Sequence, residues 1–235
     1  MNLPTYIVRS ILRPVGKGVT NPFFCTLDGV IKFDCDESPY AVYNELVAQR
    51  IGERVGAPIA AGGITISPRG EAFASLRSGA PGLSLPDLQM RQVKKVARMY
   101  PDETAALIVF DVFIGNWDRT SNVKAATISP NLKLFAAFDH GHALLAADRK
   151  LAESIRRLGL PDPIVTQHPF SEVVDRSLVQ VAADRVRRLT DSDLNGCCIL
   201  GMPFRSVSTR VQGRLAAALK VRRENIDMLL KAVLR

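Results

Sequence analysis

The polar residues that end an apolar run near the middle of the chain are the residues most able to do chemistry. The stretch FDVFIGNWDRTSNV is mostly apolar up to Gly115, then gives Asn-Trp-Asp-Arg, and Asn122 follows Asp118 by four residues. A core helix needs no such groups, because a buried polar group without a partner costs free energy. We therefore expect Asp118 and Asn122 to serve a site at the end of a helix.

Three charged residues elsewhere complete a recognisable set. Lys32 ends the apolar segment GVIK, and Asp139 ends the apolar segment in AAFDHGH. Glu45 lies on the helix expected after Lys32 and could pair with its ammonium. The order strand lysine, helix glutamate, Asp-x-x-x-Asn and a later aspartate is what phosphoryl transfer from Mg-ATP requires: a lysine on the phosphates, an aspartate on the acceptor hydroxyl, and oxygen ligands for the metal.

Elements that must position these residues follow from the hydrophobic periodicity. Residues 23–26 and 30–33 alternate around LDG and predict a hairpin. The next segment changes to helical period, with Ser38 as the expected N-cap and Gly56 as the stop. Two more strands meet at the turn SPRG, so the first third reads as an antiparallel sheet with one inserted helix.

The rest of the chain reads as helical apart from one hairpin. A helix beginning at Pro86-Asp87 is followed by a buried helix over 102–116, because DETAALIVFDVFIGN is apolar on nearly every side. A hairpin turning at SPN then carries the chain to Asp139. The remaining periodic segments predict helices over 147–158, 170–190 and 207–234.

The motifs VIKFD, NELVAQRIGERVGAP, GNWDRTSN and FDHGHAL, taken together, resemble the HipA-like kinases, particularly their short stand-alone bacterial branch. A similar pattern occurs in phosphatidylinositol 3- and 4-kinases, which share the protein-kinase-like core. The resemblance covers roughly residues 15–145. It implies an α+β, two-lobe protein-kinase-like fold in one domain, with a small antiparallel β-rich lobe over 1–80 that carries one helix and a larger α-helical lobe over 81–235.

The resemblance also implies a role for each residue of the set. Lys32 would contact the ATP phosphates and pair with Glu45. Asp118 would be the catalytic aspartate, and Asn122 and Asp139 would bind Mg²⁺.

Further cofactor-binding residues follow from the same resemblance. Residues 16–21 occupy the place of the phosphate-covering loop and supply Gly18, Thr20 and Asn21. Ser75 lies in the strand that would lead to the adenine-binding hinge.

Two positions depart from the pattern of these kinases. The spacing from Asp118 to Asn122 is one residue shorter, and Thr120 stands where a histidine often follows the Asp-Arg pair. The geometry of the metal ligands is therefore the point on which activity depends.

Composition narrows the class of protein. The chain has 235 residues, 47% hydrophobic content and a net charge of +8. From residue 145 onward we count 16 Lys+Arg against 10 Asp+Glu, so +6 of the excess lies there. The segments DRVRRL and ALKVRREN read as solvated helix faces, and with 6% aromatic residues direct nucleic-acid binding is not favoured.

No run is apolar enough for a membrane span. The four cysteines lack metal spacing and read as buried thiols in a reducing cytoplasm.

Several alternatives stay open at this point. Lys32 could guard an edge strand, Glu45 could be a surface residue, and residues 116–118 could be an ordinary helix-end turn. His140 and His142 suggest zinc, but no third ligand of suitable spacing is evident.

Two alternative functions also stay open. The first is a pseudokinase or nucleotide-binding scaffold whose basic C-terminal helices bind a regulatory partner. The second is a nucleic-acid-associated regulator, because HipA proteins often act with a DNA-binding antitoxin. For a kinase, the acceptor is unknown, and a protein hydroxyl is favoured by the resemblance alone.

Overall fold

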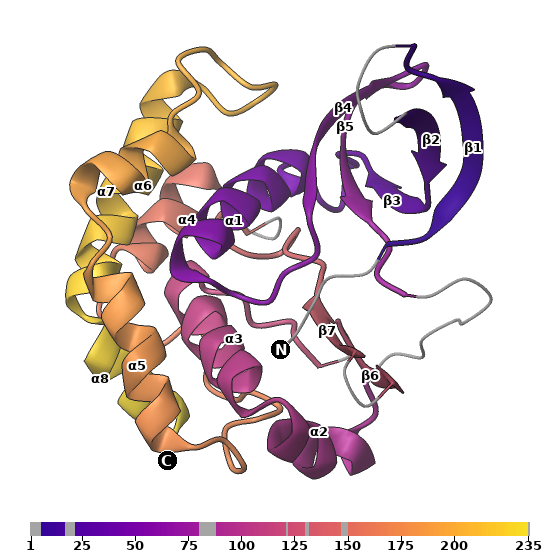
Figure 1. The fold of residues 1–235 in the computed structure, drawn as a ribbon. Helices are drawn as coiled ribbons and strands as arrows, with labels where there is room; N and C mark the ends of the chain where they lie inside the picture. Colours follow the sequence, from indigo (N-terminus) through magenta and orange to yellow (C-terminus); the bar gives the residue numbers. More distant parts are fainter. Residues whose placement is uncertain are drawn as a thin grey trace.

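The computed structural model describes residues 6–16, 22–79, 88–120, 122–129, 132–146 and 150–234. Within these ranges the fold is α+β, with three small antiparallel sheets and eight α-helices (Figure 1). The strands are β1 (Val8–Pro14), β2 (Phe23–Leu27), β3 (Gly29–Lys32), β4 (Gly62–Ser67), β5 (Gly70–Leu76), β6 (Val123–Ser129) and β7 (Leu132–Ala137). The helices are α1 (Ala41–Val55), the 3-10 turn η1 (Met90–Gln92), α2 (Val93–Met99), α3 (Pro101–Ile114), α4 (Leu151–Leu158), α5 (Arg176–Arg187), α6 (Asp191–Cys198), α7 (Thr209–Glu224) and α8 (Ile226–Val233).

The first two predicted strands form, but they do not pair with each other. β2 pairs with β1, while β3 pairs with β5 in the sheet β3-β5-β4. Only Asp28 separates β2 from β3, and a two-residue turn is the shortest common hairpin connection. The Asp28 amide donates to the Ile7 carbonyl (2.8 Å), and its carbonyl accepts from the Arg77 amide (2.9 Å). The chain thus passes from one sheet to the next, and the predicted hairpin is wrong.

Helix α1 lies between the β3-β5-β4 sheet and the helical part of the molecule (Figure 1). Its start differs from the prediction: Ser38 pairs with the backbone of Cys35, and the Val42 amide donates instead to the Asp34 carboxylate (2.9 Å). Its end is confirmed, because Gly56 adopts a left-handed φ of 68° that glycine tolerates without strain. Contacts on several sides bury most of the helix, including its polar residues Asn44, Glu45 and Gln49.

Helix α3 is the buried centre of the fold, as predicted. Its residues 104–114 are all buried, and it packs against α1, α2, α5, α7 and α8. It ends at Gly115, which has a φ of 70° and donates its amide to the Asp111 carbonyl. The predicted β6–β7 hairpin follows, with its turn residues 130–131 outside the described ranges. The polar loop that starts at Asn116 is therefore fixed at both ends by regular structure.

The C-terminal helices differ from the prediction in number. Helix α6 was not predicted, although Thr190 and Asp193 form the capping box that marks its start. The helix predicted over 207–234 is two helices, α7 and α8, which meet at Asn225. None of the helices in the described ranges is long and apolar enough to cross a bilayer. The predicted division between residues 80 and 81 falls in the span 80–87, outside the described ranges, and stays a prediction.

Two expectations about side-chain environment need correction. Cys25 and Cys35 are exposed, whereas Cys197 and Cys198 are buried as expected, and burial raises the pKa of both buried thiols. The basic C-terminal segment is not wholly a solvated face, because Arg222 is 1% exposed and reaches the interior.

Paired glycine substitutions test the packing of α1. In Gly52→Ala the new Cβ would stand 2.2 Å from Ile59 Cδ1, whereas in Gly213→Ala of α7 it would meet nothing within 4 Å. Alanine favours a helix over glycine by about 1 kcal/mol, but overpacking costs about 1–3 kcal/mol. We expect Gly213→Ala to raise the free energy of unfolding by about 0.5–1 kcal/mol and Gly52→Ala to lower it, as measured by urea denaturation. Adding Ile59→Val, which removes Cδ1, should restore part of the loss; no recovery would contradict the packing described.

Candidate active site

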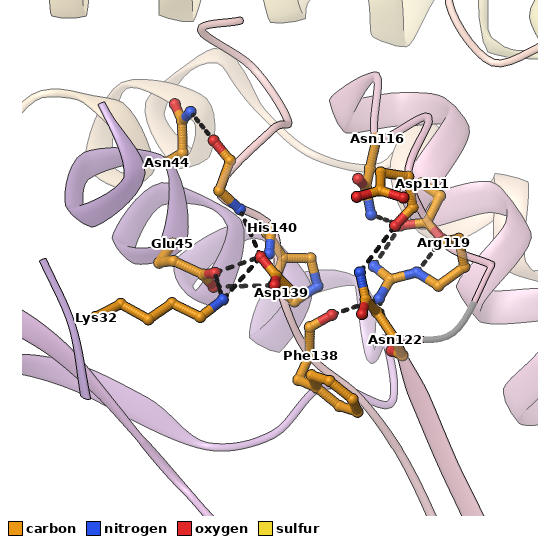
Figure 2. A network of polar contacts seen from close by, with 12 residues as sticks. Lys32, Asn44, Glu45, Asp111, Asn116, Arg119, Asn122, Phe138, Asp139 and His140 are labelled. Carbon is orange, nitrogen blue, oxygen red and sulfur yellow. Dashed lines mark hydrogen bonds and ion pairs between the residues drawn. The ribbon is translucent and has the colours of Figure 1, made fainter. Parts of the chain in front are cut away.

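Lys32 joins three elements that are distant in sequence. Its Nζ lies 2.5 Å from Glu45 Oε1 on α1 and 2.8 Å from Asp139 Oδ1, two residues after β7 (Figure 2). The predicted Lys32–Glu45 ion pair is therefore present, and the reading of Lys32 as a mere edge-strand guard is not needed. The pair with Asp139 brings the third member of the predicted set to the same point.

Glu45 is the buried partner of this group. Its side chain is 4% exposed, and it also accepts from the His140 amide (2.8 Å) and lies 3.2 Å from His140 Nδ1. Burial by itself would raise the pKa of Glu45, but the His140 and Lys32 contacts outweigh it and lower that pKa to about 2. Glu45 is thus a fixed anion, and the alternative of a surface residue is wrong.

The segment that carries Asp139 is held from α1 by Asn44 as well. The buried Asn44 amide donates to the carbonyls of Gly141 (2.8 Å) and Leu145 (2.9 Å), and its oxygen accepts from the Leu145 amide (3.2 Å). Asp139 itself has a φ of 62°, a conformation that aspartate adopts more readily than most residues. Two consecutive residues of α1, Asn44 and Glu45, therefore set the course of the chain past Asp139.

Arg119 anchors the loop that carries Asp118. Its guanidinium makes a bidentate ion pair with Asp111 of α3 (2.7 and 2.8 Å) and is 1% exposed. It also donates to the carbonyls of Asn122 (2.9 Å) and Phe138 (2.6 Å). The loop is thereby tied both to α3 and to the end of β7 (Figure 2).

The acidic end of that anchor is fully enclosed. Asp111 also accepts a hydrogen bond from Asn116 Nδ2 (2.9 Å), and its carboxylate lies 3.1 Å from His168 Nε2. Its burial opposes ionisation, but Arg119 and His168 outweigh that effect and lower the pKa of Asp111. Removing one member of a buried ion pair costs about 3–5 kcal/mol, because the other charge is left without a partner. This pair therefore makes the loop rigid.

Asp118 and Asn122 occupy the two ends of the loop. The Asn122 side-chain amide donates to the Asp118 carbonyl (3.0 Å), and the Asn122 carbonyl accepts from the Phe138 amide (3.1 Å). Among the described residues, nothing bonds to the Asp118 carboxylate or to Asn122 Oδ1. Asp118 is half-buried, so its carboxylate is available to an external group.

A second cationic clamp holds the end of α3. Arg222 of α7 donates to the carbonyls of Val112 (2.7 Å) and Phe113 (2.9 Å), which lie in the last turn of that helix. Burial, together with the nearby Arg157 guanidinium, lowers the pKa of Arg222 to about 10. A cation is favourable at a helix C-terminus, where unpaired carbonyls carry partial negative charge.

A cavity of about 290 Å³ opens beside Lys32 and Asp139. β3, β5 and the β6–β7 hairpin form its walls, and the predicted Ser75 is among its lining residues. The lining residues are Val30, Lys32, Ala60, Ser75, Leu76, Arg77, Ser78, Lys124, Ala136, Phe138 and Asp139. Its volume is at the lower end of the range for small-molecule sites.

The oxygen donors near this cavity suit a magnesium ion. Asp139 is 41% exposed, and Asn122 Oδ1 is unengaged. No group of three His, Cys, Asp or Glu residues in the described part of the chain could hold a metal ion. Mg²⁺ is commonly bound through one or two protein ligands, with water and phosphate oxygens supplying the rest.

Sequence reasoning missed some residues and placed others where they cannot be assessed. Gly18, Thr20 and Asn21 lie in 17–21, outside the described residues. Asn44 and His168 were missed; the one available signal for Asn44 was a polar residue beside Glu45 in the apolar first half of the helix.

Glu45 provides a test through acid stability. The pKa of Glu45 is near 2 in the folded protein, against the ordinary 4.5. The ionised carboxylate therefore contributes fully to the free energy of unfolding above pH 4.5, and this contribution is lost as the pH falls toward 2. Glu45→Gln should lower the free energy of unfolding at pH 7 by on the order of 3 kcal/mol and flatten its fall between pH 4.5 and 2. Glu53→Gln, an exposed change on the same helix, should stay within about 0.5 kcal/mol of the parent. Equal curves for the two variants would contradict the buried ion pair.

Comparison with known proteins adds to this geometry. No family model and no curated protein matches the sequence. Among solved structures, the Helicobacter pylori proinflammatory kinase CtkA aligns with a TM-score of 0.61 and 14% identity, covering 98% of this chain and 96% of its own.

The second similar structure is HipA of Shewanella oneidensis MR-1, described in a toxin–antitoxin complex with HipB and operator DNA. The TM-score is 0.55 at 13% identity, over 89% of this chain and 62% of the HipA chain. This protein thus spans less than two thirds of HipA. At such identities the likeness concerns the fold, and the chain has the HipA-like kinase fold that the sequence resemblance predicts.

Proposed function

We propose that this protein is a HipA-like kinase that transfers the γ-phosphate of ATP to a hydroxyl group, with a protein serine or threonine as the favoured acceptor. The observation that carries the proposal is the position of Lys32, held between Glu45 and Asp139 at the edge of the 290 Å³ cavity. An ammonium fixed by a buried carboxylate, and paired with a second, exposed carboxylate at the edge of a small cavity, is an arrangement suited to nucleotide phosphates.

Each residue takes a role that its environment supports. Lys32 binds phosphate oxygens, and Glu45 orients it because a buried carboxylate cannot turn to solvent. Asp139 and Asn122 would hold Mg²⁺, which when bound offsets charge on the phosphates. Ser75 and the other residues of the cavity walls would enclose the nucleoside. The unengaged carboxylate of Asp118 orients the acceptor hydroxyl.

The transfer itself balances with these groups alone. The acceptor oxygen forms a bond to the γ-phosphorus as the bond from that phosphorus to the bridging oxygen of ADP breaks. The hydroxyl proton passes to a carboxylate oxygen of Asp118. The negative charge left on ADP faces the Lys32 ammonium.

The exposed ion pair between Lys32 and Asp139 can give way to a metal ion. Asp139 is 41% exposed, and ion pairs at such sites contribute about 0–1 kcal/mol. Little energy therefore opposes the exchange of Lys32 for a metal ion on Asp139. Lys32 keeps its buried partner, Glu45, throughout.

The runner-up is a pseudokinase that binds nucleotide without transferring phosphate. One observation favours it: Asn122 Nδ2 donates to the Asp118 carbonyl across the shortened loop (3.0 Å), and this bond restricts where the side-chain oxygen can point. A HipB-like regulatory partner is a further proposal, and it rests on the similarity to HipA alone.

Nucleotide binding and phosphate transfer can be tested together. Mg-ATP should raise the melting temperature by several degrees, more than ATP with EDTA, because a ligand of the native state stabilises it by about 2.7 kcal/mol at a hundredfold excess over Kd. Asp139→Ala should lose the metal-dependent part of the shift. Asp118→Asn should keep the shift but lose transfer of label from γ-labelled ATP to proteins of a cell lysate.

The outcome for Asn122→Ala separates the two candidates. A smaller shift with Mg-ATP places its oxygen on the metal and agrees with a kinase. An unchanged shift, together with equal labelling by the parent and Asp118→Asn, favours the pseudokinase. No shift of the parent at millimolar Mg-ATP would contradict both.

A further inference from the structure

A second cavity, of about 410 Å³, adjoins the loop that carries Asp118. Trp117 and His142 line it, and Trp117 immediately precedes Asp118, whereas Asp139 lines the cavity beside Lys32. The remaining wall comes from α4 and the segment that follows it. The lining residues are Gly115, Trp117, His142, Leu144, Ala146, Ser154, Arg157, Leu158, Ile164, Thr166 and Gln167.

The charge of this cavity is one-sided. Arg157 lines it and makes no ion pair or side-chain hydrogen bond with any described residue, and the described lining residues include no aspartate or glutamate. Behind it, Arg222 is buried against neutral carbonyls, and the Arg157 charge contributes to the lowering of its pKa. With neither guanidinium group paired to a carboxylate in the described part of the chain, the cavity is electropositive there, so an anion would be favoured.

The walls also carry groups that suit a peptide. Ser154, Thr166 and Gln167 supply hydroxyl and amide groups. Trp117 is 57% exposed, and its ring lies 6.0 Å from that of His142 with a tilt of 49°. An exposed indole at the rim of a polar cavity is typical of a binding surface, because it combines a large apolar area with a hydrogen-bond donor.

We infer that this cavity binds an acidic side chain of the protein acceptor, within a few residues of the hydroxyl that is phosphorylated. The inference deepens the proposed kinase function and rests on it. Arg157 would pair with the carboxylate, and Trp117 would pack against the neighbouring peptide. Because Trp117 adjoins Asp118 in the chain, an acceptor anchored here would have a nearby hydroxyl within reach of the Asp118 carboxylate.

The test uses the fluorescence of Trp117, which is the only tryptophan of the chain. The full-length protein, without nucleotide, is titrated with the tryptophan-free peptide Gly-Glu-Ser-Glu-Glu-Gly and with its lysine counterpart, Gly-Lys-Ser-Lys-Lys-Gly. We expect a saturable change with the acidic peptide alone. Arg157→Gln should weaken that binding at least tenfold, as loss of a charged hydrogen-bond partner does.

Arg156→Gln is the matched control, because Arg156 is adjacent, exposed and already paired with Glu153 (2.7 Å). It should bind the acidic peptide within twofold of the parent, and both variants should keep the Mg-ATP melting shift. The inference is overturned by equal binding of the lysine peptide, by an equal loss in Arg156→Gln, or by absence of a saturable response. It is also overturned if inorganic phosphate alone binds as tightly as the peptide.

These outcomes are independent of catalysis. The titration contains no nucleotide, so its failure leaves the kinase proposal standing. Failure of the Mg-ATP shift, in turn, leaves the peptide binding readable.

Discussion

The position of one ammonium group organises this molecule. Lys32 Nζ contacts Glu45 on α1 and Asp139 after β7, and so fixes a strand, a helix and a loop to one point. A lysine can do this because its three donors need no fixed plane. Other contacts support this arrangement. Helix α1 is enclosed on several sides, and its consecutive residues Asn44 and Glu45 form hydrogen bonds with the chain that follows Asp139.

The site combines rigid and displaceable parts, and burial decides which is which. Glu45 and the Asp111–Arg119 pair are almost fully buried, so breaking either contact leaves a charge without solvent or partner. Asp139 and Asp118 are partly exposed, so a metal ion or a hydroxyl can reach them. A frame of buried ion pairs around exposed carboxylates agrees with binding of a charged ligand without rearrangement of the core.

Residue types at element ends made much of this site predictable. Lys32, Glu45, Asp118 and Asp139 each interrupt or end an apolar segment, and burial of an unpaired charge is costly enough that such positions call for partners. The pairing of β2 could not be predicted, since it depends on whether one residue, Asp28, can turn the chain. The contacts of Asn44, His168 and Arg222 could not be predicted either. These side chains bond to groups 57 to 110 residues away, and local periodicity carries no signal of such distant contacts.

The proposed kinase function requires Asp139 and Asn122 to hold one divalent cation opposite Lys32. Mn²⁺ accepts the same oxygen ligands as Mg²⁺ and broadens the NMR signals of nearby nuclei. With ATP and substoichiometric Mn²⁺, the backbone amide signals of Asn122 and of residues 138–141 should broaden first, and Asp139→Ala should remove the effect. Selective broadening elsewhere, or broadening that survives Asp139→Ala, would contradict the account.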